Sequence, residues 1–142
     1  MMVVVDTPVW SLALRRRQEN LSDQEQQLTQ ALAELIREGR VQMLGPIRQE
    51  LLSGIREESQ FRKLRDYLRD FHEQPLEASD YEEAAQMNYR CRTRGIAGSP
   101  VDFLICAAAH RHEWGIFTTD QDFQNYASVQ PLRLYSTSRP QF

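Results

Sequence analysis

Apolar and polar positions follow one another in blocks that predict short strands and longer helices in turn. The first block is Val3–Val5, three β-branched residues that favour a buried strand and stop at the carboxylate of Asp6. Thr7 and Pro8 then predict a helix cap followed by the first helical residue. Apolar blocks of similar length recur, so strands are expected at residues 2–5, 41–44, 115–119 and 132–135, with one more near 73–77.

Between these blocks, apolar residues recur at the three- and four-residue spacing of an amphipathic helix. Leu28, Leu32 and Leu35 illustrate that spacing. We therefore expect helices over residues 7–17, 22–39, 45–54, 58–71, 79–94, 99–115 and 120–127.

Capping residues mark the ends of several predicted helices. A serine three residues before a glutamate, which is the capping-box pattern, occurs at 22–25 and again at 79–82. Ser99 followed by Pro100 predicts a helix start, and Gly115 is the expected exit of the same helix.

Strands that alternate with helices favour an α/β fold, because parallel strands are joined by crossover helices. A chain of 142 residues is long enough for one such domain with a substantial core. The sequence thus predicts a single domain over residues 1–142, built as an α/β sandwich around a mainly parallel sheet, with more helix than strand.

The basic residues are almost all arginine, with Lys63 as the only lysine. A net charge of −3 argues against a generic basic coat for nucleic acid. Arginine clusters can form local sites, however, because the guanidinium fork suits phosphate and carboxylate groups. The alternative is that they are solvated helix faces. The clusters with a candidate binding role are Arg15, Arg16, Arg17 and Arg90, Arg92, Arg94.

Nothing in the sequence predicts a membrane or an oxidising compartment. The longest nearly uncharged apolar stretch, residues 101–110, is about half the length that spans a bilayer. No export leader is evident, and Cys91 and Cys106 are too few for a disulfide framework. A cytoplasmic protein with reduced thiols is therefore expected.

Acidic residues stand at or near the ends of several predicted strands. Asp6 and Asp120 follow strands directly, and Asp122 comes two residues later. Glu50 and Asp102 lie on helices, the latter in a first turn. In a parallel sheet all of these can converge on the carboxyl edge, where ligands bind in open α/β folds. Taken singly, each acid could instead be a turn or capping residue or a solvated side chain.

Several carboxylates in one cleft repel one another and need a cationic partner. Mg²⁺ and Mn²⁺ prefer oxygen ligands and act together with water and substrate phosphates. A site of this kind is suited to the hydrolysis of phosphodiester bonds.

Four segments carry a resemblance to a known family: "VVVDTPVWS", "GPIRQELLSG", "GIAGSPVDFLICAAAH" and "IFTTDQDF". In this order and spacing they resemble PIN-domain ribonucleases, in particular the VapC toxins of bacterial type II toxin–antitoxin modules. The resemblance implies a PIN-like three-layer α/β/α sandwich with roughly five strands. It also implies that Thr118 orients the site through its hydroxyl. The acidic metal ligands that it implies are Asp6, Glu50, Asp102 and Asp120, with Asp122 as a fifth acid.

What the resemblance implies for function is Mg²⁺- or Mn²⁺-dependent cleavage of RNA. It further implies a homodimer and a cognate VapB-type antitoxin, and the arginine clusters would suit either RNA phosphates or an acidic antitoxin segment. Two alternatives stay open: a free-standing RNA-processing PIN nuclease without an antitoxin, and an inactive PIN-like RNA-binding module. The presence of all four main acids favours the active enzyme.

Overall fold

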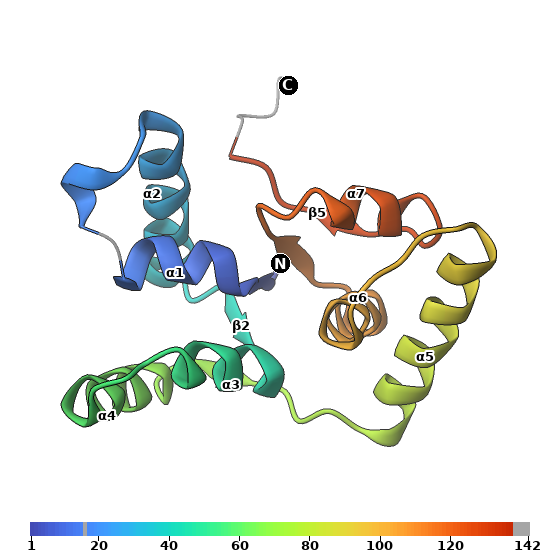
Figure 1. Cartoon of the computed structure of the whole chain (residues 1–142), viewed down its shortest axis with the longest axis horizontal. Helices are drawn as coiled ribbons and strands as arrows, with labels where there is room; N and C mark the ends of the chain where they lie inside the picture. Colours follow the sequence, from blue (N-terminus) through green and yellow to red (C-terminus); the bar gives the residue numbers. More distant parts are fainter. Residues whose placement is uncertain (16, 138–142) are drawn as a thin grey trace.

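One parallel sheet lies at the centre of this computed structural model, which describes residues 1–15 and 17–137 (Figure 1). Within those residues the sheet has five strands in the order β3-β2-β1-β4-β5, and every neighbouring pair is parallel. Their bounds are β1 Val3–Val5, β2 Val41–Met43, β3 His72–Glu73, β4 Gly115–Phe117 and β5 Arg133–Leu134.

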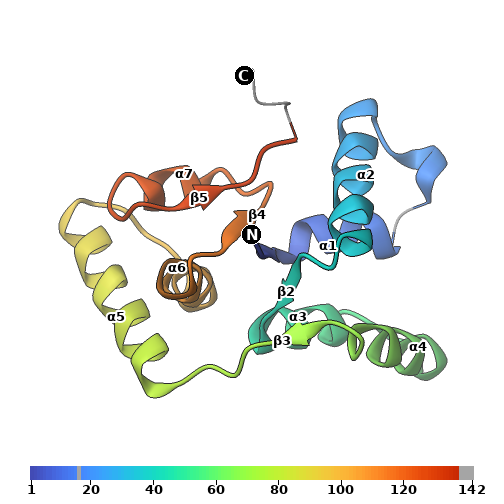
Figure 2. The same cartoon turned by 180° about the vertical axis from the view of Figure 1, so that it is seen from behind.

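Helices cover both faces of the sheet. In Figure 1, α1–α4 lie to the left of the strands and α5–α7 to the right, and Figure 2 shows the same division from behind. The predicted PIN-like α/β fold, with more helix than strand, is confirmed. The helices are α1 Thr7–Arg15, the 3-10 helix η1 Gln18–Asn20, α2 Asp23–Arg37, α3 Gly45–Ser53, α4 Glu58–Leu68, α5 Ala78–Thr93, α6 Pro100–His112 and α7 Asp122–Ala127.

The central strand explains why the chain begins with an unbroken apolar run. Val3–Val5 pairs with β2 on one side and β4 on the other, and all three side chains are buried. A strand covered on both faces has no solvent-facing position, so its residues do not alternate between apolar and polar. On one side Trp10 packs edge-on against Phe71, with ring centroids 5.2 Å apart. On the other, residues 105–109 of α6 are buried and mostly small.

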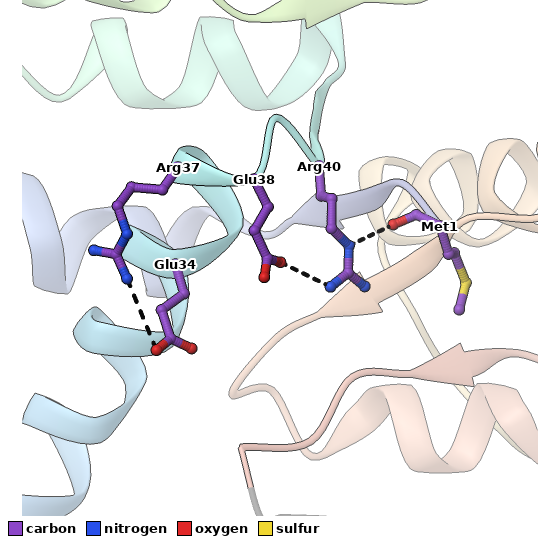
Figure 3. A network of polar contacts seen from close by, with 5 residues as sticks. All are labelled: Met1, Glu34, Arg37, Glu38 and Arg40. Carbon is purple, nitrogen blue, oxygen red and sulfur yellow. Dashed lines mark hydrogen bonds and ion pairs between the residues drawn. The ribbon is translucent and has the colours of Figure 1, made fainter.

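An arginine fixes the amino-terminal end of the sheet (Figure 3). The Nε of Arg40 donates to the carbonyl oxygen of Met1 over 2.9 Å, and its Nη1 donates to Glu38 over 3.0 Å. The backbone N–H of Val3 donates to the carbonyl of the same arginine. The starts of β1 and β2 are thereby tied together, at the end of the sheet opposite to their carboxyl ends.

The two predicted capping boxes have different outcomes. At α2 the prediction is confirmed, because the Ser22 hydroxyl accepts from the Glu25 N–H and the Glu25 carboxylate accepts from the Ser22 N–H. At α5 the prediction of a box at 79–82 is wrong, since the N-cap lies two residues earlier, at Glu77, and the box pairs Glu77 with Asp80.

A tertiary contact explains the shifted box. The carboxylate of Asp80 is 1% exposed and accepts hydrogen bonds from the Glu77 N–H and from the Arg111 guanidinium of α6. Such a buried carboxylate needs partners on both sides, and only this helix start supplies them. Asp80 therefore joins the start of α5 to the end of α6.

Three other predicted boundaries also need correction. Helix α1 begins at Thr7 itself, so Thr7 is its first residue, not its cap. Helix α6 ends at His112 and is closed by Glu113 in the left-handed conformation, with φ 58°. Gly115 instead belongs to β4, because its N–H donates to the Met2 carbonyl and it pairs with β1. Strand β3 lies at His72–Glu73, at the beginning of the region where it was expected.

Within the residues that the structure describes, no helix combines the length and the apolar character needed to cross a bilayer.

We predict that Asp80→Ala lowers the free energy of unfolding by about 2–4 kcal/mol, because it removes a buried acceptor and leaves the Glu77 N–H and Arg111 without it. Urea denaturation followed by circular dichroism measures the change. The control is Asp66→Ala, whose side chain is 62% exposed and pairs only at the surface. Its loss should stay below about 1 kcal/mol. Equal losses in the two variants would contradict the structural role of Asp80.

Candidate metal centre at the carboxyl edge of the sheet

Asp6 lies at the carboxyl end of the central strand and is 6% exposed. Its N–H continues the sheet pairing by donating to the Phe117 carbonyl over 2.8 Å. Its two carboxylate oxygens have separate partners: Oδ1 accepts from the Thr7 N–H at 2.9 Å, and Oδ2 accepts from the Thr118 hydroxyl at 2.7 Å. The carboxylate is thus held in one orientation by groups from two strands' ends.

Thr118 joins the ends of β1 and β4. Its Oγ1 donates to Asp6 and accepts from the Asp120 N–H at 3.0 Å. The Asp120 carboxylate in turn accepts from the Asp122 N–H at 2.9 Å. The turn after β4 is therefore connected to Asp6 by a chain of hydrogen bonds through the Thr118 hydroxyl.

Asp102 comes to the same edge from the start of α6. Its N–H donates to the Ser99 hydroxyl at 3.1 Å, so the predicted serine cap is confirmed. Its Oδ2 accepts from the Tyr126 hydroxyl of α7 at 2.8 Å. The Tyr126 ring packs against Phe103 and Phe123, each with centroids 5.2 Å away, so the hydroxyl is held firmly against the carboxylate.

Gly98 and Tyr126 are site residues that the sequence reasoning missed. A Cβ at Gly98 would lie 2.7 Å from the Tyr126 hydroxyl oxygen and 2.6 Å from Phe103, so only glycine lets the loop pass here. The signal for Gly98 was a glycine directly before the Ser99 cap. Tyr126, three residues after Phe123 on one helix, gave no sign that its hydroxyl faces an acid.

The acids at this edge influence one another's pKa. Burial raises the pKa of Asp6 to about 6; the hydrogen bonds from Thr118 and Thr7 act against this rise, and the charges of Asp102 and Glu50 add to it. The pKa of Glu50, an exposed side chain, is raised by partial desolvation and by the charge of Asp102. Three acids from β1, α3 and α6 therefore feel one another's charge.

Asp102 also feels the acids of the turn after β4. Burial raises its pKa, the Tyr126 hydrogen bond lowers it, and the charges of Asp120 and Asp122 raise it. Asp102 therefore links the two halves of the acid set, which consists of Asp6, Glu50, Asp102, Asp120 and Asp122.

The donor chemistry of this acid set suits a hard divalent cation. All five groups are carboxylates, and in the described part of the chain none of them pairs with a lysine, arginine or histidine. Within residues 1–15 and 17–137, no three histidine, cysteine or acidic side chains form a ready-made metal-binding group. Hydrogen bonds connect Asp6, Asp120 and Asp122, whereas Glu50 and Asp102 interact with the other acids through charge. Like charges in one region favour the binding of a cation.

The candidate arginines of the 90–94 cluster differ in their surroundings. Arg90 donates to Gln130 and lies 4.0 Å from Glu83, while Arg94 donates to the Ser128 carbonyl. These two guanidinium groups hold the end of α5 to the segment after α7. Arg92 is exposed.

The other cluster is only partly described. Arg17 is exposed and lies 3.7 Å from Glu19. Arg16 lies outside the described residues, and so does the side chain of Arg15.

Comparison with models of known protein families identifies the family of this chain. The sequence profile of the PIN domain matches residues 3–129, a span that contains all five acids. The chain belongs to the PIN domain family. PIN domains are typically nucleases that bind a divalent metal. A search of curated protein sequences finds no match.

Solved structures with the same fold come from toxin–antitoxin complexes. A chain of FitAcB from Neisseria gonorrhoeae is 20% identical, with 96% of this PIN domain chain and 98% of that chain covered and a TM-score of 0.73. A chain of VapBC2 from Rickettsia felis bound to a promoter DNA fragment is 16% identical, with 95% of this chain and 98% of that chain covered and a TM-score of 0.73. A chain of VapBC-1 from nontypeable Haemophilus influenzae is 13% identical, with 98% of this chain and 100% of that chain covered and a TM-score of 0.70. At such identities the likeness establishes the shared fold.

The raised pKa of Asp6 predicts a pH-dependent stability difference. The pKa of Asp6 is about 6 in the folded protein, against about 3.8 for an ordinary aspartate in the unfolded chain. The protonated side chain therefore contributes fully to stability below pH 4, and this contribution is lost as pH rises through 6. Asp6→Asn should therefore gain on the order of 2–3 kcal/mol relative to wild type between pH 4 and pH 7 in metal-free buffer. Urea denaturation across this range, beside Asp66→Asn, measures it. A constant difference would contradict the prediction.

Removing the Tyr126 hydroxyl should raise the pKa of Asp102 further, because that hydrogen bond favours the charged carboxylate. Carboxyl carbon shifts in an NMR titration of metal-free Tyr126→Phe measure the change. Tyr89→Phe is the matched control, since Tyr89 is 67% exposed. An Asp102 pKa that stays the same or falls in Tyr126→Phe would show that the tyrosine does not stabilise the ionised form.

Proposed function

We propose that this PIN domain protein is the toxic component of a type II toxin–antitoxin system and acts as a Mg²⁺- or Mn²⁺-dependent endoribonuclease. The observation that carries the proposal is the convergence of carboxylates from β1, α3, α6 and the β4–α7 turn, with Asp102 electrostatically coupled to all of the others. Membership of a family of typical nucleases and the likeness to toxin–antitoxin structures support it.

The proposed ligands are carboxylates whose mutual repulsion a cation would relieve. A bound divalent cation would polarise the scissile phosphodiester and make hydroxide available from water near neutral pH. Glu50 is exposed on α3 and has a long side chain, so it can adjust its position on binding. The proposed metal ligands are Asp6, Glu50, Asp102 and Asp120, with Asp122 as a fifth carboxylate at the rim.

Two hydroxyl groups orient these ligands. Thr118 binds the Asp6 carboxylate and the backbone of Asp120, and Tyr126 binds one oxygen of Asp102. The second oxygen of Asp6 accepts from the Thr7 N–H. Hydrolysis in this arrangement adds water across the phosphodiester and leaves a 5′-phosphate on one product, as the family resemblance implies.

A groove far from the acids supports an antitoxin partner. A hollow of about 660 Å³ lies between α1, the α3–α4 connection and α4, and its walls include Leu14, Ile55, Leu64 and the partly exposed Tyr67. Polar and charged residues, Arg56, Glu57, Gln60 and Lys63, also line it. A groove between helices with both apolar and polar walls is suited to an amphipathic segment of another protein. We propose that a VapB-type antitoxin occupies it, that the exposed Arg17 and Arg92 contact RNA or antitoxin, and that the protein is a homodimer.

The nuclease proposal predicts metal-dependent cleavage of total RNA by the purified protein. Cleavage should require Mg²⁺ or Mn²⁺, stop with EDTA, and fall by roughly 100-fold or more in Asp6→Asn and in Asp102→Asn, because each removes one of the few charged ligands. Gel analysis measures the rate, and a 5′-phosphate-dependent exonuclease tests the product ends.

Asp66→Asn, on the exposed face of α4, is the matched control and should cut like wild type. If wild type and both site variants cut identically, or if wild type cuts with neither metal, the nuclease proposal fails. RNA binding without cleavage would point to the inactive RNA-binding module. Normal cleavage with no growth arrest on expression would point to the free-standing processing enzyme.

A further inference from the structure

Two adjoining hollows border the turn after β4. One, of about 390 Å³, lies between the start of α2, the β4–α7 turn and the chain after β5, and the other, of about 440 Å³, lies between α1 and α2. Both are lined by Gln24, Leu28 and Thr119, so they form one continuous groove. Three side-chain amides, those of Gln24, Gln121 and Gln124, line it together with hydroxyl groups such as that of Thr119, and we call it the amide groove.

One end of the amide groove borders the acid site. The 390 Å³ hollow is also lined by Thr118 and Asp120, the residues that connect the β4 turn to Asp6. A group bound in this hollow therefore lies beside Asp120, one of the five acids. Its volume falls within the range of roughly 300–1,000 Å³ that is usual for small-ligand sites.

The polar groups of the amide groove are available for a ligand. Gln24 extends from the first turn of α2, and Gln121 and Gln124 come from the α7 region; all three are exposed. Their side-chain amides have no hydrogen-bond partner among the described residues. Each amide offers a donor pair and an acceptor side by side.

The charge of the groove selects against a phosphate. Among the described residues, Asp120 is the one charged side chain that lines the 390 Å³ hollow, and Glu25 is the one that lines the other. No lysine or arginine of the described part lines either hollow, so a phosphate placed here would meet only like charge.

The same lining suits an uncharged planar base. Side-chain amides pair with the donor and acceptor edges of nucleobases, often through two hydrogen bonds at once. The walls add apolar and aromatic surface from Leu28 and from Tyr135, a half-buried ring packed 4.9 Å from Phe117. Unpaired RNA bases stack on such surfaces.

We propose that the amide groove binds one unpaired nucleobase next to the scissile phosphodiester and so determines the base preference of cleavage. The inference rests on the proposed nuclease function for the position of the cut, and on the groove itself for the binding of the base.

The cleavage test uses a randomised single-stranded RNA pool, with product ends determined by sequencing. Wild type should prefer particular bases at one position beside the cut. The variants Gln24→Ala, Gln121→Ala and Gln124→Ala, singly and combined, should reduce that preference, by roughly tenfold in the combined variant. The matched control is Gln86→Ala, an exposed glutamine on α5, and it should keep the wild-type profile.

A binding test without metal keeps the two proposals separable. The side-chain NH₂ signals of Gln24, Gln121 and Gln124 in ¹⁵N NMR spectra should move when a randomised hexaribonucleotide is added, and should stay in place with an abasic hexamer. The Gln86 signal should move with neither. These measurements need no catalysis.

The outcomes lead to different conclusions. If the amide signals respond to the bases but wild type does not cut, the groove is supported and the nuclease function is wrong. If wild type cuts RNA, the combined variant keeps the same base preference and the amide signals do not respond, the groove proposal is overturned and the nuclease proposal stands. It is also overturned if only an antitoxin peptide moves the signals.

Discussion

The carboxylate of Asp6 is almost completely buried at the end of the central strand, where an isolated charge is unfavourable, and the rest of the site is arranged around it. The pairing of β1 with β4 brings in Thr118, whose hydroxyl partly compensates for burial by donating to Asp6. The remaining destabilisation appears as a pKa near 6, and repulsion from Asp102 and Glu50 is part of it. The apolar pairing of Val3–Val5 holds this charge in place.

The packing of α5, α6 and α7 against one another controls the position of Asp102. Asp80 joins α5 to the end of α6, while at the other end of α6 Asp102 accepts from Tyr126. Gly98 allows the connecting loop to pass close to that tyrosine. Because α6 carries both contacts, the position of Asp102 depends on the packing of three helices and not only on its own capped first turn.

The two kinds of polar surface at this edge are complementary. The acid set is wholly anionic, whereas the amide groove that borders it has Asp120 and Glu25 as its charged side chains among the described residues. Arg90 and Arg94, which the charge pattern suggested for RNA or antitoxin, hold the end of α5 to the chain after α7. Charge clusters in a sequence do not show which arginines already have partners in the fold.

The sequence by itself determined the order of strands and helices, the capping box at Ser22 and the positions of the acids near strand ends. These features depend on local periodicity and capping, which a short segment carries alone. Only the tertiary structure decided that the α5 box uses Asp80, that Arg111 pairs with it, and that Tyr126 faces Asp102. Each of these follows from hydrogen bonds or packing between residues distant in sequence, which no local pattern encodes.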